Sequence, residues 1–151
     1  MERFGVEYIS GSTRRFLMTR INIVHPSELT DQHLIAEYRE IFMVGSALQR
    51  SLKSKSWDIK SIPKRYTLNT GHVKFFYNKG KYLSKRYDEL RTEMKNRGMT
   101  PDPTRIFKKE QWPDELWNDW MPLVGDYKII RQRIQEKIEM KPNWYRKTMG
   151  L

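Results

Sequence analysis

The sequence predicts an all-α fold, a single compact domain of three helices joined by long irregular connections. Three stretches carry apolar residues at helical spacing, and no pair of stretches alternates like the strands of a sheet. A length of 151 residues suits one domain with a core of its own. Only 38% of the residues are apolar, so the five Trp, eight Tyr and six Phe must supply much of that core.

The first helix is expected over residues 28–46. Apolar side chains recur there every four residues from Leu34 onward. Ser27 or Thr30 can cap its start with a side-chain oxygen, and Gly45 marks its expected end.

Two further helices are expected over residues 72–97 and 125–140. Gly98 is a suitable stop for the second helix, and Pro142 ends the third. Between them, residues 99–122 hold four prolines and three tryptophans. This stretch is therefore predicted to be an irregular connector held by its aromatic side chains, with a helical turn at most.

One face of the first helix gathers groups that can do chemistry. His33, Glu37 and Glu40 are spaced to share a face, with Arg39 beside them. Such residues commonly form a solvated helix surface, and His33 with Glu37 could also form half of a metal site. The chain has two further histidines and no cysteine, so little ligand material remains. We therefore expect no metal or other cofactor.

The charge balance predicts a polyanionic partner. There are 29 Lys and Arg against 18 Asp and Glu, a formal charge of +11, which indicates nucleic acid first and an anionic membrane second. No apolar run approaches the roughly 20 residues of a membrane span. The absence of cysteine excludes a disulfide scaffold and a thiol nucleophile. No signal peptide is recognisable, so a cytoplasmic location is expected.

A basic loop is expected between the first two helices. It surrounds Trp57 with the cationic residues Arg50, Lys53, Lys55, Lys60, Lys64 and Arg65. Such a run can follow a phosphate backbone, but it can equally be an ordinary exposed loop whose tryptophan packs onto the core. The sequence leaves both alternatives open.

The beginning of the chain contains a second possible start. Residues 1–17 show no clear periodicity and are interpreted as a flexible extension or as sequence upstream of the true start, so the domain is expected over residues 18–151. Met18 is followed by a small residue, the context in which an initiator methionine is removed. Its removal would leave a free amine on Thr19, beside Arg20.

Several segments in a fixed order carry a resemblance to a known family. They are Met18-Thr19-Arg20-Ile21-Asn22, Asp31-Gln32-His33-Leu34, Ala36-Glu37-Tyr38-Arg39-Glu40, Gly71-His72-Val73, Phe75-Phe76-Tyr77, Lys85-Arg86, Glu136-Lys137-Ile138, Pro142 and Trp144-Tyr145. Together they resemble the phage pyrimidine-dimer DNA glycosylase/AP lyase family, the endonuclease V of large tailed phages. Each motif alone is weak, but their collinearity from Met18 to Tyr145 is specific.

The resemblance implies a compact endonuclease V-like fold and a two-step reaction on UV-damaged double-stranded DNA, carried out by a monomer. One base of a pyrimidine dimer is excised, and the strand is then cleaved at the abasic site through an imine followed by β-elimination. By the same resemblance, Thr19 supplies the nucleophilic amine and Glu40 is the catalytic carboxylate. The residues implied to bind DNA are Arg20, Gln32, His33, Arg39, Arg133, Lys137, Trp144 and Tyr145.

Three features depart from the family pattern. Met43 stands where the phage enzymes have an arginine, the tail after Trp144 is shorter and less aromatic, and residues 1–17 would block the amine if retained. Two other functions therefore remain open: a catalytically silent DNA-binding protein on the same scaffold, and the same chemistry on another modified base.

Overall fold

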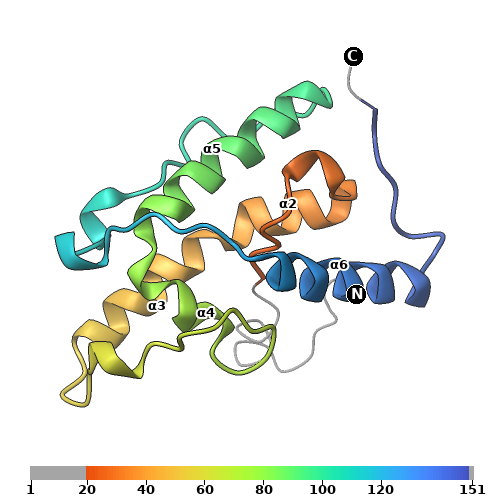
Figure 1. Ribbon diagram of the computed structural model, residues 1–151. Helices are drawn as coiled ribbons and strands as arrows, with labels where there is room; N and C mark the ends of the chain where they lie inside the picture. The colour runs from red at the N-terminus through yellow and green to blue at the C-terminus, as the bar shows by residue number, and fades with distance from the viewer. Residues whose placement is uncertain (1–19, 150–151) are drawn as a thin grey trace, which may run out of the picture.

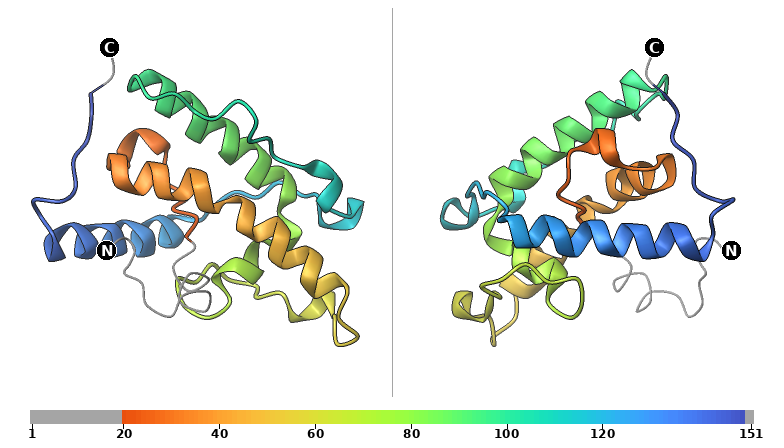
Figure 2. Two further views of the ribbon diagram at one scale, coloured as in Figure 1. Left: turned by 180° about the vertical axis from the view of Figure 1, so that it is seen from behind. Right: turned by 45° about the vertical axis from the view of Figure 1, so that its right-hand side comes forward.

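The computed structural model describes residues 20–149, and the regular structure in this part of the chain is entirely helical. Its α-helices are α2 (Asp31–Glu40), α3 (Phe42–Leu52), α4 (His72–Phe75), α5 (Gly80–Asn96) and α6 (Val124–Met140). Its 3₁₀ turns are η1 (Pro26–Glu28), η2 (Ile59–Ser61), η3 (Phe76–Asn78), η4 (Lys109–Gln111) and η5 (Asp114–Leu116). α3 continues almost in line from α2, which lies between α5 on one side and α6 on the other (Figures 1 and 2). The predicted all-α class is confirmed.

The first helix starts at Asp31, three residues after the predicted start at residue 28, and Thr30 is the one of the two candidate caps that precedes it. Thr30 caps α2 by accepting a hydrogen bond at Oγ1 from the His33 amide, at 3.1 Å. The predicted end at Gly45 is wrong, because that glycine lies inside α3. A Cβ atom there would collide with the side chain of Gln111, so Gly45 permits close packing rather than a stop. Ile41, with φ −58° and ψ −29°, keeps helical angles between α2 and α3.

The predicted second helix is divided into α4, η3 and α5. A Cβ atom on Gly80 would lie 2.7 Å from atoms of both Trp112 and Trp117, so α5 begins where the backbone touches two indole rings. Gly98 ends this helix as predicted, with φ +82° and with the Met99 amide donating to the Met94 carbonyl at 2.9 Å.

The connector before α6 closes the aromatic core. The indole ring of Trp120 lies with centroid distances of 5.0 Å to Tyr82 and 5.2 Å to Phe75. Trp112 is buried, and the connector contains only the two short turns η4 and η5. This agrees with the prediction of an irregular segment held by its aromatic residues.

Trp57 in the basic loop packs onto the core. It is partly buried and its ring centroid lies 6.1 Å from that of Tyr77. The neighbouring cationic side chains are exposed, namely Lys53, Lys55, Lys60, Lys64 and Arg65. The tryptophan therefore has a packing role, and the binding role of the basic residues stays a prediction.

α6 follows its predicted bounds within one residue. Ile130 is fully buried and Ile134 packs partly against the core, as their spacing predicted. Arg133 and Lys137 lie on a different face of α6, which borders a cavity beside α2. None of the helices described between residues 20 and 149 is long and apolar enough to cross a membrane.

Candidate active site

A cavity of about 220 Å³ lies where the start of the described chain meets α2, α6 and the C-terminal tail. Its lining residues are Arg20, Asn22, His33, Ala36, Glu37, Glu40, Arg133, Ile134, Lys137 and Tyr145. Six of these belong to the set that the sequence singled out as site residues. We call it the carboxylate cavity, because Glu37 and Glu40 from α2 both line it.

The backbone that leads into this cavity is held by side chains from other elements. The Ile21 amide donates to Nε2 of His72 at 2.8 Å, and the Tyr66 hydroxyl donates to the Ile21 carbonyl at 2.9 Å. The Asn22 amide and side chain both donate to Oε1 of Glu37, at 3.1 and 2.9 Å. Arg20 donates from Nη1 to the Leu68 carbonyl at 2.6 Å. Residues 20–22 are therefore fixed at the cavity wall.

The next residue of this segment is strained. Ile23 is buried and has φ +48°, in the left-handed region that a β-branched residue adopts only at a cost of about 1–3 kcal/mol. The adjacent Val24 carbonyl accepts a hydrogen bond from Arg86 at 2.5 Å. The surrounding contacts hold Ile23 in this conformation. The conformation of Ile23 in turn helps to set the backbone path of residues 20–22.

His72 is a neutral structural residue. Because Nε2 accepts from the Ile21 amide, Nδ1 carries the proton and donates to the Thr67 carbonyl at 2.7 Å. Burial lowers the pKa of His72 to about 4, with the charge of Arg20 acting in the same direction. Neither His72 nor Tyr66 was singled out individually from the sequence. Their roles depend on residues that are distant in the chain, although Gly71-His72-Val73 was one of the resembling motifs.

The two carboxylates of α2 have different environments. Glu37 is 1% exposed, and Arg86 donates to it from Nε at 2.6 Å and from Nη2 at 3.0 Å. Together with the two bonds from Asn22, these hydrogen bonds occupy both carboxylate oxygens of Glu37. Glu37 therefore has a structural role, and its oxygens do not form a metal site with His33. Glu40 is only partly buried and lies close enough to Arg20 to affect the pKa of its guanidinium. Glu40 is therefore the more accessible of the two carboxylates in the cavity.

Three cationic side chains share the cavity with Glu40. Burial, followed by the charge of Arg133, lowers the pKa of Arg20. Burial and the charges of Arg133 and Arg20 likewise lower the pKa of Lys137. These mutual effects show that the three charges are close together, which favours an anionic ligand such as a phosphodiester.

His33 is neutral at physiological pH, although the sequence suggested an ionisable group. Burial, then the charges of Lys137 and Arg20, lower the pKa of His33 to about 4. Its Nδ1 is 2.7 Å from Oγ1 of Thr30, and its ring stacks on Tyr145 with centroids 4.7 Å apart. His33 and Tyr145 therefore form an uncharged wall of the cavity.

Gln32 holds the C-terminal tail. Its amide nitrogen donates to the Trp144 carbonyl at 2.8 Å, and its amide oxygen accepts from the Arg146 amide at 3.1 Å. Nearby, Asp31 accepts from the Thr148 hydroxyl at 2.6 Å and from the buried guanidinium of Arg97 at 2.8 Å. These contacts explain why the tail rises beside the start of α2 (Figure 1).

Besides Gln32, two described residues of the predicted site do not line the carboxylate cavity. Arg39 is exposed on α2 and does not line the carboxylate cavity. Trp144 is 47% exposed on the tail, next to Tyr145, which does line the cavity. Thr19 lies outside the described residues.

These features define a helical protein with a cationic cavity built around one accessible carboxylate, which suits an enzyme acting on a nucleic acid. Comparison with known families is more specific: the sequence model described as pyrimidine dimer DNA glycosylase matches residues 18–107. The chain belongs to this family and is by family a DNA glycosylase in the repair of UV damage, with DNA as its substrate. The matched region ends before α6 and the C-terminal tail. The tertiary structure is what brings Arg133, Lys137 and the tail to the cavity.

Proposed function

We propose that this protein excises one base of a UV-induced pyrimidine dimer in double-stranded DNA and then cleaves the strand at the abasic site, with the α-amine of Thr19 as nucleophile. The amine attacks the sugar C1′, and the bond to the base breaks as the base takes up a proton. Opening of the sugar ring leaves an imine between C1′ and the amine. Loss of the C2′ proton then breaks the C3′–O bond, and water hydrolyses the imine to regenerate the amine.

The observation that carries the proposal is the fixed backbone at residues 20–22 beside a cavity that holds Glu40. Thr19 directly precedes Arg20 in the sequence, and Arg20 lines the cavity. An α-amine has an ordinary pKa of roughly 7.7–8.0, so an appreciable fraction is unprotonated at neutral pH. The positive charges of Arg20, Arg133 and Lys137 would lower that pKa further.

Glu40 is the proposed catalytic carboxylate. Positive charge develops on the sugar as the base departs, and a nearby carboxylate stabilises it. The same group can assist the later proton transfers. Glu37 is unsuited to this role because Arg86 and Asn22 occupy its oxygens.

The remaining site residues are proposed to bind DNA in different ways. Arg20, Arg133 and Lys137 hold phosphates at the cavity, while Arg39 and Trp144 reach the duplex outside it. His33 and Tyr145 form an uncharged surface against the lesion, and Gln32 acts by holding the tail.

The decisive experiment compares two forms of the protein, one beginning at Thr19 and one retaining residues 1–17. Borohydride reduces an imine to a stable amine, so the first form should become covalently attached to abasic or UV-irradiated DNA. The second form has its Thr19 nitrogen in an amide, which is not nucleophilic, and should bind such DNA but trap poorly. A Thr19→Ala protein that begins at position 19 keeps the amine and serves as a control that should still trap.

Other outcomes discriminate the alternatives. Equal trapping by both forms would place the nucleophile elsewhere, for example on a lysine with a strongly lowered pKa. DNA binding without trapping by either form would identify a catalytically silent DNA-binding protein. Trapping on another damaged base, but not on irradiated DNA, would assign the same chemistry to a different lesion.

A further inference from the structure

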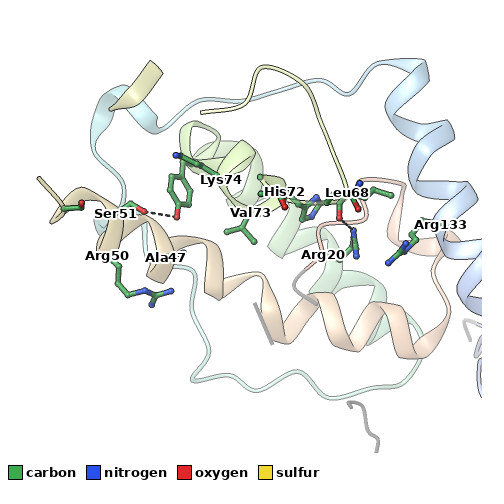
Figure 3. Close-up of a pocket in the computed structure, with 14 residues that line it drawn as sticks. Arg20, Ala47, Arg50, Ser51, Leu68, His72, Val73, Lys74 and Arg133 are labelled. Carbon is green, nitrogen blue, oxygen red and sulfur yellow. Dashed lines mark hydrogen bonds between the residues drawn. The ribbon is translucent and has the colours of Figure 1, made fainter. Parts of the chain in front are cut away.

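A second and larger hollow adjoins the carboxylate cavity. It has a volume of about 840 Å³ and lies between α3, the turn at residues 68–71 and α4 (Figure 3). Arg20 and Arg133 line both hollows, so the two hollows adjoin at these side chains. We call this second hollow the strand groove. The sequence-based expectations assigned Arg20 and Arg133 to DNA and left open whether the basic loop with Arg50 follows a phosphate backbone, but they did not group these residues with Lys74 in one site.

The strand groove is lined by cations and by no acidic residue among the described part of the chain. Its four cationic residues are Arg20, Arg50, Lys74 and Arg133. Arg50 lies at one end, on the last turn of α3, and Arg20 and Arg133 lie together at the other (Figure 3). Four cationic side chains along one hollow favour a polyanionic ligand.

The uncharged lining of the groove suits a sugar–phosphate chain. Ala47, Leu68 and Val73 offer apolar surface in the groove, and Ser54, Asn69 and Thr70 add groups that can hydrogen-bond. His72 adds no positive charge, because its pKa is about 4 and both ring nitrogens are engaged. Recognition in the groove therefore depends on Arg50 and Lys74 at the end remote from the carboxylate cavity.

We propose that the strand groove binds the phosphodiester backbone of the damaged strand next to the lesion, with Arg50 and Lys74 contacting its phosphates. This assignment rests on the proposed function. If the sugar reacts in the carboxylate cavity, the strand that carries it continues past Arg20 and Arg133 into the groove. The groove is then a positioning site that fixes the strand on one side of the reacting sugar. Arg50 and Lys74 set affinity and register and take no part in bond breaking.

The test uses the double variant Arg50→Gln/Lys74→Gln, with Lys95→Gln/Lys108→Gln as a control that removes the same charge from exposed positions outside both hollows. Binding is measured to a duplex that contains a tetrahydrofuran abasic analogue, which cannot form an imine. Two lost phosphate contacts should weaken binding by about 10- to 100-fold and make the slope of log K against log salt shallower by about 1.8. The control variant should weaken binding by less than about threefold.

A second measurement locates the contacts with the unaltered protein. Neutral methylphosphonates are introduced one at a time along the damaged strand. Substitution should weaken binding at a short run of positions on one side of the lesion, and the double variant should lose its sensitivity at those positions alone. In single-turnover reactions, the double variant should need about 10- to 100-fold more DNA for half-saturation than the parent protein.

Two results would overturn the proposal: affinity lost no more than in the control variant, or an unchanged methylphosphonate pattern. A double variant that binds the abasic analogue normally but fails to react would also contradict it, because the groove would then serve chemistry. Since the analogue assay involves no covalent step, failure of the Thr19 mechanism would leave the binding result readable.

Discussion

Arg86 and Glu37 form a buried ion pair, with Nε 2.6 Å from Oε2 and Nη2 3.0 Å from Oε1, and with both side chains at most 1% exposed. Removing one partner would leave the other charge buried and uncompensated. We therefore expect Glu37→Gln to lower the free energy of unfolding by about 3–5 kcal/mol. Urea denaturation measures this, with Glu89→Gln on the exposed surface of α5 as the control. A loss below about 1 kcal/mol would contradict the assigned structural role.

Glu40→Gln tests the second carboxylate of α2. The change keeps the shape of the side chain and removes its charge, so binding to damaged DNA should stay within a few-fold of the parent protein. Base release in single-turnover assays should fall by about a thousandfold, because a preorganised charge is lost from the transition state. A parent-like rate would remove Glu40 from the mechanism, and loss of the folded circular dichroism spectrum would indicate a structural role instead.

Lys137→Ala should weaken DNA binding through a phosphate contact. Its expected signature is a similar loss for undamaged duplexes of every sequence, with the slope of log K against log salt shallower by about one unit. Fluorescence anisotropy over a salt series measures both quantities. Glu136→Ala, the neighbouring exposed position on α6, is the control and should not make the slope shallower. A loss confined to particular sequences would mean that Lys137 reads bases rather than phosphates.

The lowered pKa of His72 predicts that the free energy of unfolding depends on pH. Its pKa is about 4 in the folded protein against an ordinary value near 6.5, so the unfolded chain binds more protons between these values. The stabilisation is complete above the unfolded pKa and is lost as the pH falls toward 4, by about 2 kcal/mol at pH 5. Urea titrations at pH 7 and pH 5 check this. The variant His72→Gln removes this titrating group. The decrease in the free energy of unfolding from pH 7 to pH 5 should therefore be smaller in that variant, whatever its stability at pH 7.

Gln32→Ala should loosen the C-terminal tail, because both side-chain bonds to the tail backbone are lost. Trypsin cleavage after Arg146 or Lys147 should become several-fold faster, and half-saturation with damaged DNA should require more enzyme as Tyr145 leaves the cavity wall. The control is Gln135→Ala on α6, whose amide contacts Glu139 at 3.2 Å. Unchanged proteolysis combined with weaker DNA binding would instead support direct contact between Gln32 and DNA.

The helical class, the cap at Thr30, the stop at Gly98 and the course of α6 could be predicted from the sequence. Each depends on residues within a few positions of one another, where spacing, capping and backbone preference are decided. Gly45 shows the limit of such reasoning, because its close contact with Gln111 depends on a residue far along the chain.

The sequence by itself also determined the positive charge, the order of the resembling motifs and the grouping of His33, Glu37 and Glu40 on one helix face. The resemblance pointed to Glu40, but only the tertiary structure showed that Glu37 is held in a buried ion pair, because its partner Arg86 is 49 positions away. It also made His33 neutral by burying it beside Lys137 and Arg20, and it brought α6 and the tail to a cavity formed by α2. Periodicity is encoded locally, whereas burial and charge pairing depend on distant residues that only folding brings together.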